Sequence, residues 1–100
     1  MGKLERDFQR ELIADLKRMF KGCIILKNDP TYIQGIPDLI ILYGTRWASL
    51  EVKKSRTASY RPNQEYYVEL MDDMSFSRFI YPENKEEVLY ELQETLFAGR

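Results

Sequence analysis

The sequence predicts an α/β fold in which helices flank a mixed central sheet. Apolar residues recur at helical spacing near the start of the chain, after residue 62 and near its end. Short apolar, β-branched runs with the length of strands lie between these segments. The expected order is helix, three strands, helix, strand and C-terminal helix. One hundred residues fit a single domain, residues 1–100, with one core.

The first predicted helix spans residues 4–20 and precedes the first predicted strand. Its apolar stripe consists of Leu4, Phe8, Leu12, Leu16, Met19 and Phe20. Gly22 is a plausible stop signal, and residues 23–26 read as a short buried strand that ends at Asn28-Asp29-Pro30. Cys23 is expected to be a core residue rather than a nucleophile, since one cysteine cannot form an internal disulfide.

Two further strands are predicted after a loop at residues 28–37. Residues 39–43 are continuously apolar and stop at Gly44, which is typical of a central strand. Residues 47–53 alternate, so that Ala48, Leu50 and Val52 face one side of the sheet while Glu51 and Lys53 share the other.

The second half of the chain predicts a helix, a strand and a last helix. A polar linker at residues 55–60 leads to Pro62, where a helix can begin, followed by Tyr66, Tyr67, Leu70 and Met71 at helical spacing. Residues 75–81 read as a strand, and Pro82 precedes the last helix. The apolar side of that helix packs either on the sheet or on a second copy of the chain; it contains Val88, Leu89, Leu92 and Leu96.

Composition excludes several classes of function. The chain has no histidine, so Ser/His/Asp triads, His-ligated zinc and His general bases are ruled out. No phosphate-binding loop of the GxxxxGK[ST] kind appears, and no apolar run approaches the roughly 18 residues that a membrane helix needs. The charged start, without an apolar export signal, makes the cytoplasm the expected location.

Asp38, Glu51 and Lys53 form the constellation that indicates chemistry. Asp38 opens the central strand, and a tight hairpin through Gly44 and Thr45 would place it beside Glu51 on the next strand. Two adjacent carboxylates repel each other, which favours a hard cation such as Mg²⁺ between them. Lys53 can orient an attacking water or offset charge on a phosphate.

Positive charge gathers around these residues. Residues 1–64 hold twelve lysines and arginines against seven acids, whereas residues 65–100 hold three against nine. Phosphate attraction is the favoured interpretation if the carboxylates are catalytic; the alternative is a solvated charged loop. The candidate nucleic-acid-binding residues are Lys27, Arg46, Lys54, Arg56 and Arg61. The acidic last helix should face away from DNA.

The ordered motifs resemble those of the PD-(D/E)xK nucleases, and more closely the VRR-NUC domains, including small stand-alone phage versions. Archaeal Holliday-junction resolvases are more distantly similar. The resemblance covers nearly the whole chain and rests on Glu5-Arg6-Asp7-Phe8-Gln9, Gly35-Ile36-Pro37-Asp38-Leu39, Leu50-Glu51-Val52-Lys53 and Pro62-Asn63-Gln64. It implies a restriction-endonuclease-like αβββαβ core with an additional C-terminal helix.

The resemblance also implies roles for single residues. Asp38, Glu51 and the Val52 carbonyl would be metal ligands, Lys53 the catalytic lysine, and Gln64 would point toward the site. The helix-one acid is Glu5, which projects near the middle of the apolar stripe, with Glu11 as the fallback. Resolvase-like relatives suggest a homodimer, and a helicase or another phage replication or recombination protein is a possible partner.

The expected function is that of an Mg²⁺-dependent DNA endonuclease, with Mn²⁺ as a substitute, that is selective for branched or four-way-junction DNA. One alternative is a catalytically silent nucleic-acid-binding or regulatory module on a nuclease fold. Another is a structural phage protein that dimerises through its last helix. Tyr32, Tyr60, Tyr66 and Tyr67 either stack on unpaired bases or pack at the core and its rim.

Overall fold

The computed structural model describes residues 4–97 of the chain. Its elements follow the predicted order, with a single 3₁₀ turn added before the last helix. They are α1 (Glu5–Met19), β1 (Ile24–Lys27), β2 (Leu39–Tyr43), β3 (Arg46–Val52), α2 (Gln64–Met74), β4 (Ser77–Ile80), η1 (Pro82–Asn84) and α3 (Lys85–Phe97). The α/β class, the mixed sheet flanked by helices and the C-terminal helix are therefore confirmed.

The four strands lie in the order β1-β2-β3-β4. The first three form an antiparallel meander, and β4 runs parallel to β3. The hairpin between β2 and β3 turns through Gly44 and Thr45, as predicted, with Tyr43 paired to Arg46. Gly44 has φ +62°, a backbone conformation that glycine adopts without strain. A parallel pair needs a crossover connection, and α2 provides it between β3 and β4.

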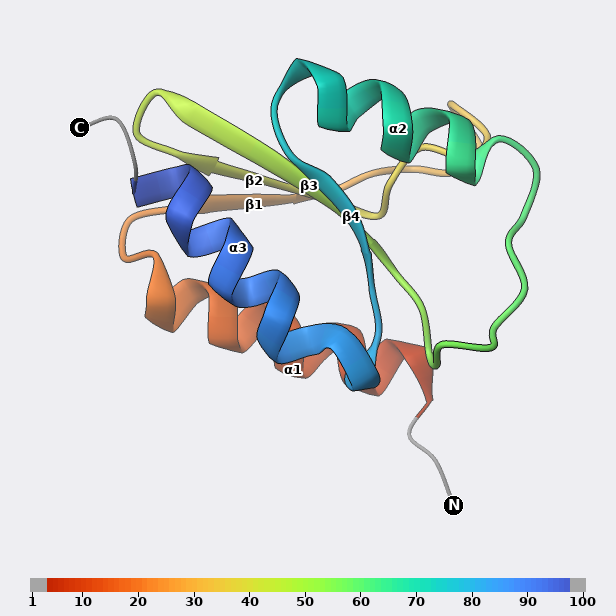
Figure 1. Ribbon diagram of the computed structural model, residues 1–100, viewed down its shortest axis with the longest axis horizontal. Helices are drawn as coiled ribbons and strands as arrows, with labels where there is room; N and C mark the ends of the chain where they lie inside the picture. The colour runs from red at the N-terminus through yellow and green to blue at the C-terminus, as the bar shows by residue number, and fades with distance from the viewer. Residues whose placement is uncertain (1–3, 98–100) are drawn as a thin grey trace.

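The main core lies between one face of the sheet and the two helices α1 and α3, which run side by side below the strands in Figure 1. Both helices direct their predicted apolar stripes into this layer, except at Leu4, which precedes α1 and is 54% exposed. The fully buried members are Leu12, Leu16, Phe20, Leu39, Ile41, Ala48, Leu50, Val52, Ile80 and Leu92. Val88 and Leu96 of α3 are also buried here, so the apolar side of the last helix packs within its own chain.

Helix α2 covers the opposite face of the sheet over β3 and β4 (Figure 1). This cover explains why Ser49 and Glu51, on the polar face of β3, are nearly as buried as the apolar Leu50 between them. The other half of this face, on β1 and β2, is open: Ile24 is 57% exposed and Leu26 is 45% exposed. The expectation of a buried first strand was therefore wrong, because β1 is an edge strand that no helix among residues 4–97 covers on one face.

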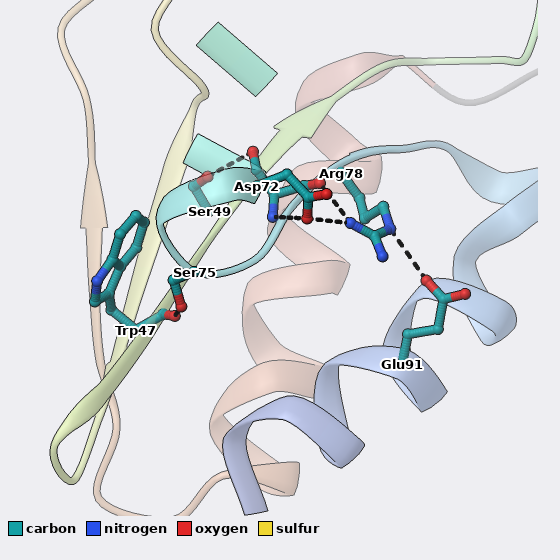
Figure 2. A network of polar contacts seen from close by, with 7 residues as sticks. Trp47, Ser49, Asp72, Ser75, Arg78 and Glu91 are labelled. Atoms are coloured by element: carbon teal, nitrogen blue, oxygen red, sulfur yellow. Dashed lines mark hydrogen bonds and ion pairs between the residues drawn. The ribbon is translucent and has the colours of Figure 1, made fainter. Parts of the chain in front are cut away.

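A polar network secures the C-terminal end of α2 against the sheet and α3 (Figure 2). The Arg78 guanidinium bonds Asp72 of α2 and Glu91 of α3, and thereby ties together the helices on the two faces of the sheet. The buried Ser49 hydroxyl donates to the Ser77 hydroxyl at 2.7 Å, and the Ser75 hydroxyl donates to the Trp47 carbonyl. These bonds fix β4 and the end of α2 against β3.

Within residues 4–97, no helix has both the length and the apolar character needed to cross a membrane.

Candidate active site

The β2–β3 register brings Asp38 and Glu51 together. Leu39 pairs with Leu50, so one further step along both strands places Asp38 opposite Glu51 on the face that carries α2. Asp38 is half-buried, and its Oδ2 accepts a hydrogen bond from the Val52 N–H at 2.9 Å. The carbonyl of Asp38 accepts from the Asn28 N–H at 2.9 Å, which ties the start of β2 to the end of β1.

Pro37 explains why a backbone oxygen is available beside these carboxylates. Extending the register by a second step places Val52 opposite Pro37, at a position where paired residues exchange two ladder bonds. Proline has no N–H, so Pro37 cannot donate to the Val52 carbonyl. The Val52 N–H instead donates to Asp38, and the Pro37 carbonyl accepts from the Asn28 side chain at 2.7 Å. The Val52 carbonyl, an expected metal ligand, therefore lies outside the regular ladder with β2.

Glu51 is an almost fully buried acid, and one of its oxygens accepts no hydrogen bond from the described residues. Only 3% of the residue is exposed. Its Oε2 accepts from Gln64, but Oε1 is buried and has no hydrogen-bond partner within residues 4–97. Burial, followed by the nearby Asp38 carboxylate, raises the pKa of Glu51 to about 8, although Lys53 opposes the shift. Burial also raises the pKa of Asp38.

Lys53 follows β3 immediately and lies on the same side as Glu51. Only 5% of the residue is exposed, and its N–H donates to the Ile80 carbonyl, which continues the pairing with β4. The ammonium donates to Gln64 Oε1 at 2.6 Å and to the Ser59 carbonyl at 3.0 Å. It also lies 5.5 Å from the centre of the Tyr60 ring. These contacts fix a positive charge beside the two carboxylates.

Gln64, the first residue of α2, connects the acid and the base of the site. Its Oε1 accepts from Lys53 and from the Arg61 N–H at 2.8 Å, while its Nε2 donates to Glu51 Oε2 at 2.9 Å. In the reverse orientation, the Gln64 amide nitrogen would face two other donors, the Lys53 ammonium and the Arg61 N–H. The hydrogen-bond network therefore determines the orientation of the amide. Gln64 therefore points toward Lys53 and Glu51, and its part in an active site stays a prediction.

The helix-one acid that lies near this centre is Glu5. Glu5 shares a cleft of about 760 Å³ with Asp38, Glu51, Lys53 and Gln64, whereas Glu11 borders a separate hollow beside Phe8 and Pro82. Partial burial, followed by repulsion from Asp38, raises the pKa of Glu5. Glu5 is nonetheless exposed at the start of α1, and its role as a metal ligand stays a prediction.

The donor set fits a divalent cation in one respect. The buried Glu51 Oε1 atom has no hydrogen-bond partner among residues 4–97, and such an atom is stabilised by a cation or a proton. In the described part of the chain, however, no three Asp, Glu or Cys side chains gather closely enough to form a metal-binding cluster. A cation would therefore rest on Asp38, Glu51, the Val52 carbonyl and water, a mixture that suits Mg²⁺.

The structure separates the five basic candidates into two groups. Lys54 and Arg61 line the cleft, and Arg56 lies on the same loop. Lys27 pairs with the core residue Leu39, so its side chain lies on the face of the sheet opposite Asp38 and Glu51 and is not brought to the cleft. Arg46 begins β3, five residues before Glu51, and the rise of a strand places it roughly 17 Å away along the sheet. Arg46 is therefore not brought to the cleft.

Sequence reasoning missed two parts of the cleft wall. The Ser59 carbonyl binds Lys53 from an irregular loop, where no periodic pattern predicts the direction of a backbone oxygen. Gly35 approaches the start of α2 so closely that an added Cβ would lie 2.6 Å from the Asn63 Cβ. Gly35 contacts Asn63, 28 residues later in the chain. The sequence shows the glycine but does not show which residue it approaches.

No known family model, curated protein or solved structure matches this chain.

Proposed function

We propose that this chain is a metal-dependent DNA endonuclease that hydrolyses phosphodiester bonds, with selectivity for branched or four-way-junction DNA. The observation that carries the proposal is the buried Glu51 carboxylate, which lies beside Asp38 and is linked through Gln64 to the Lys53 ammonium. An acid in this setting is unfavourable for stability, which favours a functional reason for its presence. The order of motifs around it supports membership of the VRR-NUC group and a restriction-endonuclease-like topology.

Asp38, Glu51 and the Val52 carbonyl would hold the cation, Mg²⁺ or Mn²⁺. When bound, such an ion polarises a phosphoryl oxygen and lowers the pKa of a bound water. Both carboxyls have a raised pKa, so the pair favours a bound proton, which it would release when it holds a cation.

Lys53 supplies the fixed positive charge for the reaction. Its ammonium is held by two hydrogen bonds and opens onto the same cleft as Asp38 and Glu51. A preorganised cation is most effective where negative charge develops, here on the phosphate oxygens or on the attacking water. Gln64 keeps the ammonium and the Glu51 carboxylate at a constant separation, because it bonds to both.

Phosphate binding is assigned to Lys54 and Arg61, whose side chains line the cleft, and to Arg56 of the same loop. Each neutralises backbone charge without reading bases, which fits a nuclease that recognises the shape of DNA. The acidic α3 lies on the opposite face of the sheet from α2, away from this cleft.

A second copy of the chain is the proposed protein partner. The open half of the sheet and the adjoining flank of α2 expose apolar side chains between 36% and 67%: Ile24, Leu26, Leu42, Leu70 and Met74. An isologous dimer would set this surface against itself and present two clefts to two DNA strands. We expect a wild-type dimer by light scattering and a monomer for Leu26→Glu; a monomeric wild type would remove the dimer from the proposal.

The decisive experiment compares cleavage of labelled linear, flapped and four-way-junction DNA with Mg²⁺, Mn²⁺ or EDTA. We expect cutting that requires metal and is abolished in Glu51→Gln, which preserves the shape of the side chain. Thermal unfolding provides a parallel readout, since Mg²⁺ should raise the Tm of the wild type but not of Glu51→Gln. Binding without cutting under every condition would instead support the silent nucleic-acid-binding module. A helicase or another replication protein as partner, and the cytoplasm as location, stay predictions.

A further inference from the structure

Three consecutive loop residues hold the Lys53–Gln64 pair. The Ser59 carbonyl accepts from the Lys53 ammonium at 3.0 Å, and the Arg61 N–H donates to Gln64 Oε1 at 2.8 Å. Between them, the Tyr60 ring centre lies 5.5 Å from the Lys53 nitrogen, within the range of a cation–π contact. The loop thus contacts the pair through a carbonyl, a ring and an N–H in sequence order.

The Tyr60 ring is itself fixed by the sheet. It stacks on Phe79 of β4 with 4.3 Å between ring centres and 8° between ring planes. Phe79 is the β4 residue paired with Glu51, so the ring that contacts Lys53 is positioned by the neighbour of the acid. Tyr60 is 47% exposed whereas Lys53 is 5% exposed, which places the ring on the outer side of the buried lysine.

These contacts give the Tyr60 ring a role within the chain that needs no stacked base. Phe79 covers one face of the ring, and the Lys53 ammonium lies within cation–π range of the same ring. The attraction between an ammonium and an aromatic face requires the ring but not the hydroxyl. Phenylalanine should therefore replace tyrosine here, whereas leucine should not.

We propose that Tyr60 is a positioning residue for Lys53, and this role rests on the proposed nuclease function. Phe79 holds the Tyr60 ring in place, and the ring in turn holds the Lys53 ammonium. Lys53 therefore stays aligned with Glu51 when the substrate is bound. Tyr60 itself does not touch the reacting atoms. Its loss should lower the rate of the chemical step without weakening DNA binding.

The kinetic test compares Tyr60→Phe and Tyr60→Leu on the best DNA substrate. We expect Tyr60→Leu to lower kcat about tenfold with KM within about twofold, and Tyr60→Phe to retain wild-type values. In a Lys53→Met background, Tyr60→Leu should cause no further loss, since the ammonium that it positions is absent. Tyr90→Leu, at a 60% exposed tyrosine of α3, is the matched control and should have no effect. A raised KM with unchanged kcat in Tyr60→Leu, or equal losses in both Tyr60 variants, would overturn the proposal.

Nuclear magnetic resonance provides a readout that does not depend on activity. In the metal-free protein, the Lys53 methylene protons next to the nitrogen should be shifted upfield by the Tyr60 ring relative to those of Lys54. The shift should persist in Tyr60→Phe and shrink in Tyr60→Leu. An unshifted Lys53 would refute the contact even if the wild type cuts DNA. A shifted Lys53 in a protein that cuts nothing would overturn the proposed function, and with it the positioning role, while the contact itself would stand.

Discussion

The side-chain amide of Gln64 lies between Lys53 and Glu51, accepting from the ammonium at 2.6 Å and donating to the carboxylate at 2.9 Å. This one residue joins the first turn of α2 to the end of β3. The relative position of the basic and acidic groups therefore depends on how α2 is seated as well as on the strand.

Replacing Gln64 with leucine should harm both stability and activity. The change leaves Glu51 Oε2 and the Lys53 ammonium each with one hydrogen bond fewer in a buried setting, and such a loss costs about 1–3 kcal/mol. We expect urea unfolding to show a decrease of this size, together with a large fall in the cleavage rate. Gln93→Leu, on α3, is the control. Equal stability of the two variants would show that the amide bridge is not formed in solution.

The pKa of Glu51 predicts a metal-free protein that becomes less stable as pH rises. In the unfolded chain this carboxyl titrates near 4.5, whereas in the folded chain its pKa is about 8. Between these values the folded state retains a proton that the unfolded state has released, so rising pH favours unfolding. We expect the free energy of unfolding, measured in EDTA, to decline across this window and to vary much less in Glu51→Gln. Parallel profiles for the two proteins would be incompatible with the raised pKa.

Alanine at Gly35 should displace the loop from the start of α2. The new Cβ would lie 2.6 Å from the Asn63 Cβ and 2.8 Å from the Pro62 carbonyl oxygen, and the residue has φ +90°. Gly22→Ala is a matched control, because Gly22 has φ +88° and nothing within 4 Å of an added Cβ. The free energy of unfolding of the control should fall by about 1–2 kcal/mol from backbone strain alone. Gly35→Ala should lose more in urea unfolding and also lose cleavage activity; identical losses would mean that the close approach is absent.

The position of Arg46 predicts a difference between two arginines in DNA binding. Arg61 lines the cleft, whereas Arg46 lies at the start of β3, at the end of the strand far from Glu51. We expect Arg61→Gln to weaken binding and to reduce the dependence of log K on log salt by about 0.9 for each lost phosphate contact. Arg46→Gln should leave both quantities unchanged. Salt titrations measured by fluorescence anisotropy decide the matter, and a larger effect at Arg46 would move the DNA path away from the cleft.

The fold was predictable where periodicity is strong. The apolar stripe of α1 and the continuous run of β2 each identify an element, and the motif at Gly44 locates the hairpin that pairs Asp38 with Glu51. The exposed edge strand β1 was not predictable, since an apolar run such as Ile24 to Leu26 has the same appearance whether or not a helix covers it.

The site was predictable to the extent that strand alternation and family motifs determine it. Alternation places Glu51 and Lys53 on one face, and the resemblance points to Gln64. The contacts of Ser59 and Tyr60 come from an irregular loop, where sequence gives no direction to a carbonyl or a ring. Arg46 was wrongly grouped with the cleft because it is near Glu51 in the sequence. An extended strand separates residues by about 3.3 Å each, so five residues place Arg46 far from Glu51.

The most direct test of the central claim is the single-turnover cleavage rate at saturating Mg²⁺ for Lys53→Met beside Lys54→Met. These neighbouring lysines are matched in charge, but Lys53 is buried in the hydrogen-bond network whereas Lys54 is exposed. The account predicts a rate at least about 100-fold lower for Lys53→Met, the size of effect typical of a lost electrostatic stabiliser, and a bound-state rate close to wild type for Lys54→Met. Equal rates in the two variants, with DNA bound, would contradict the assignment of Lys53 and of the site built around it.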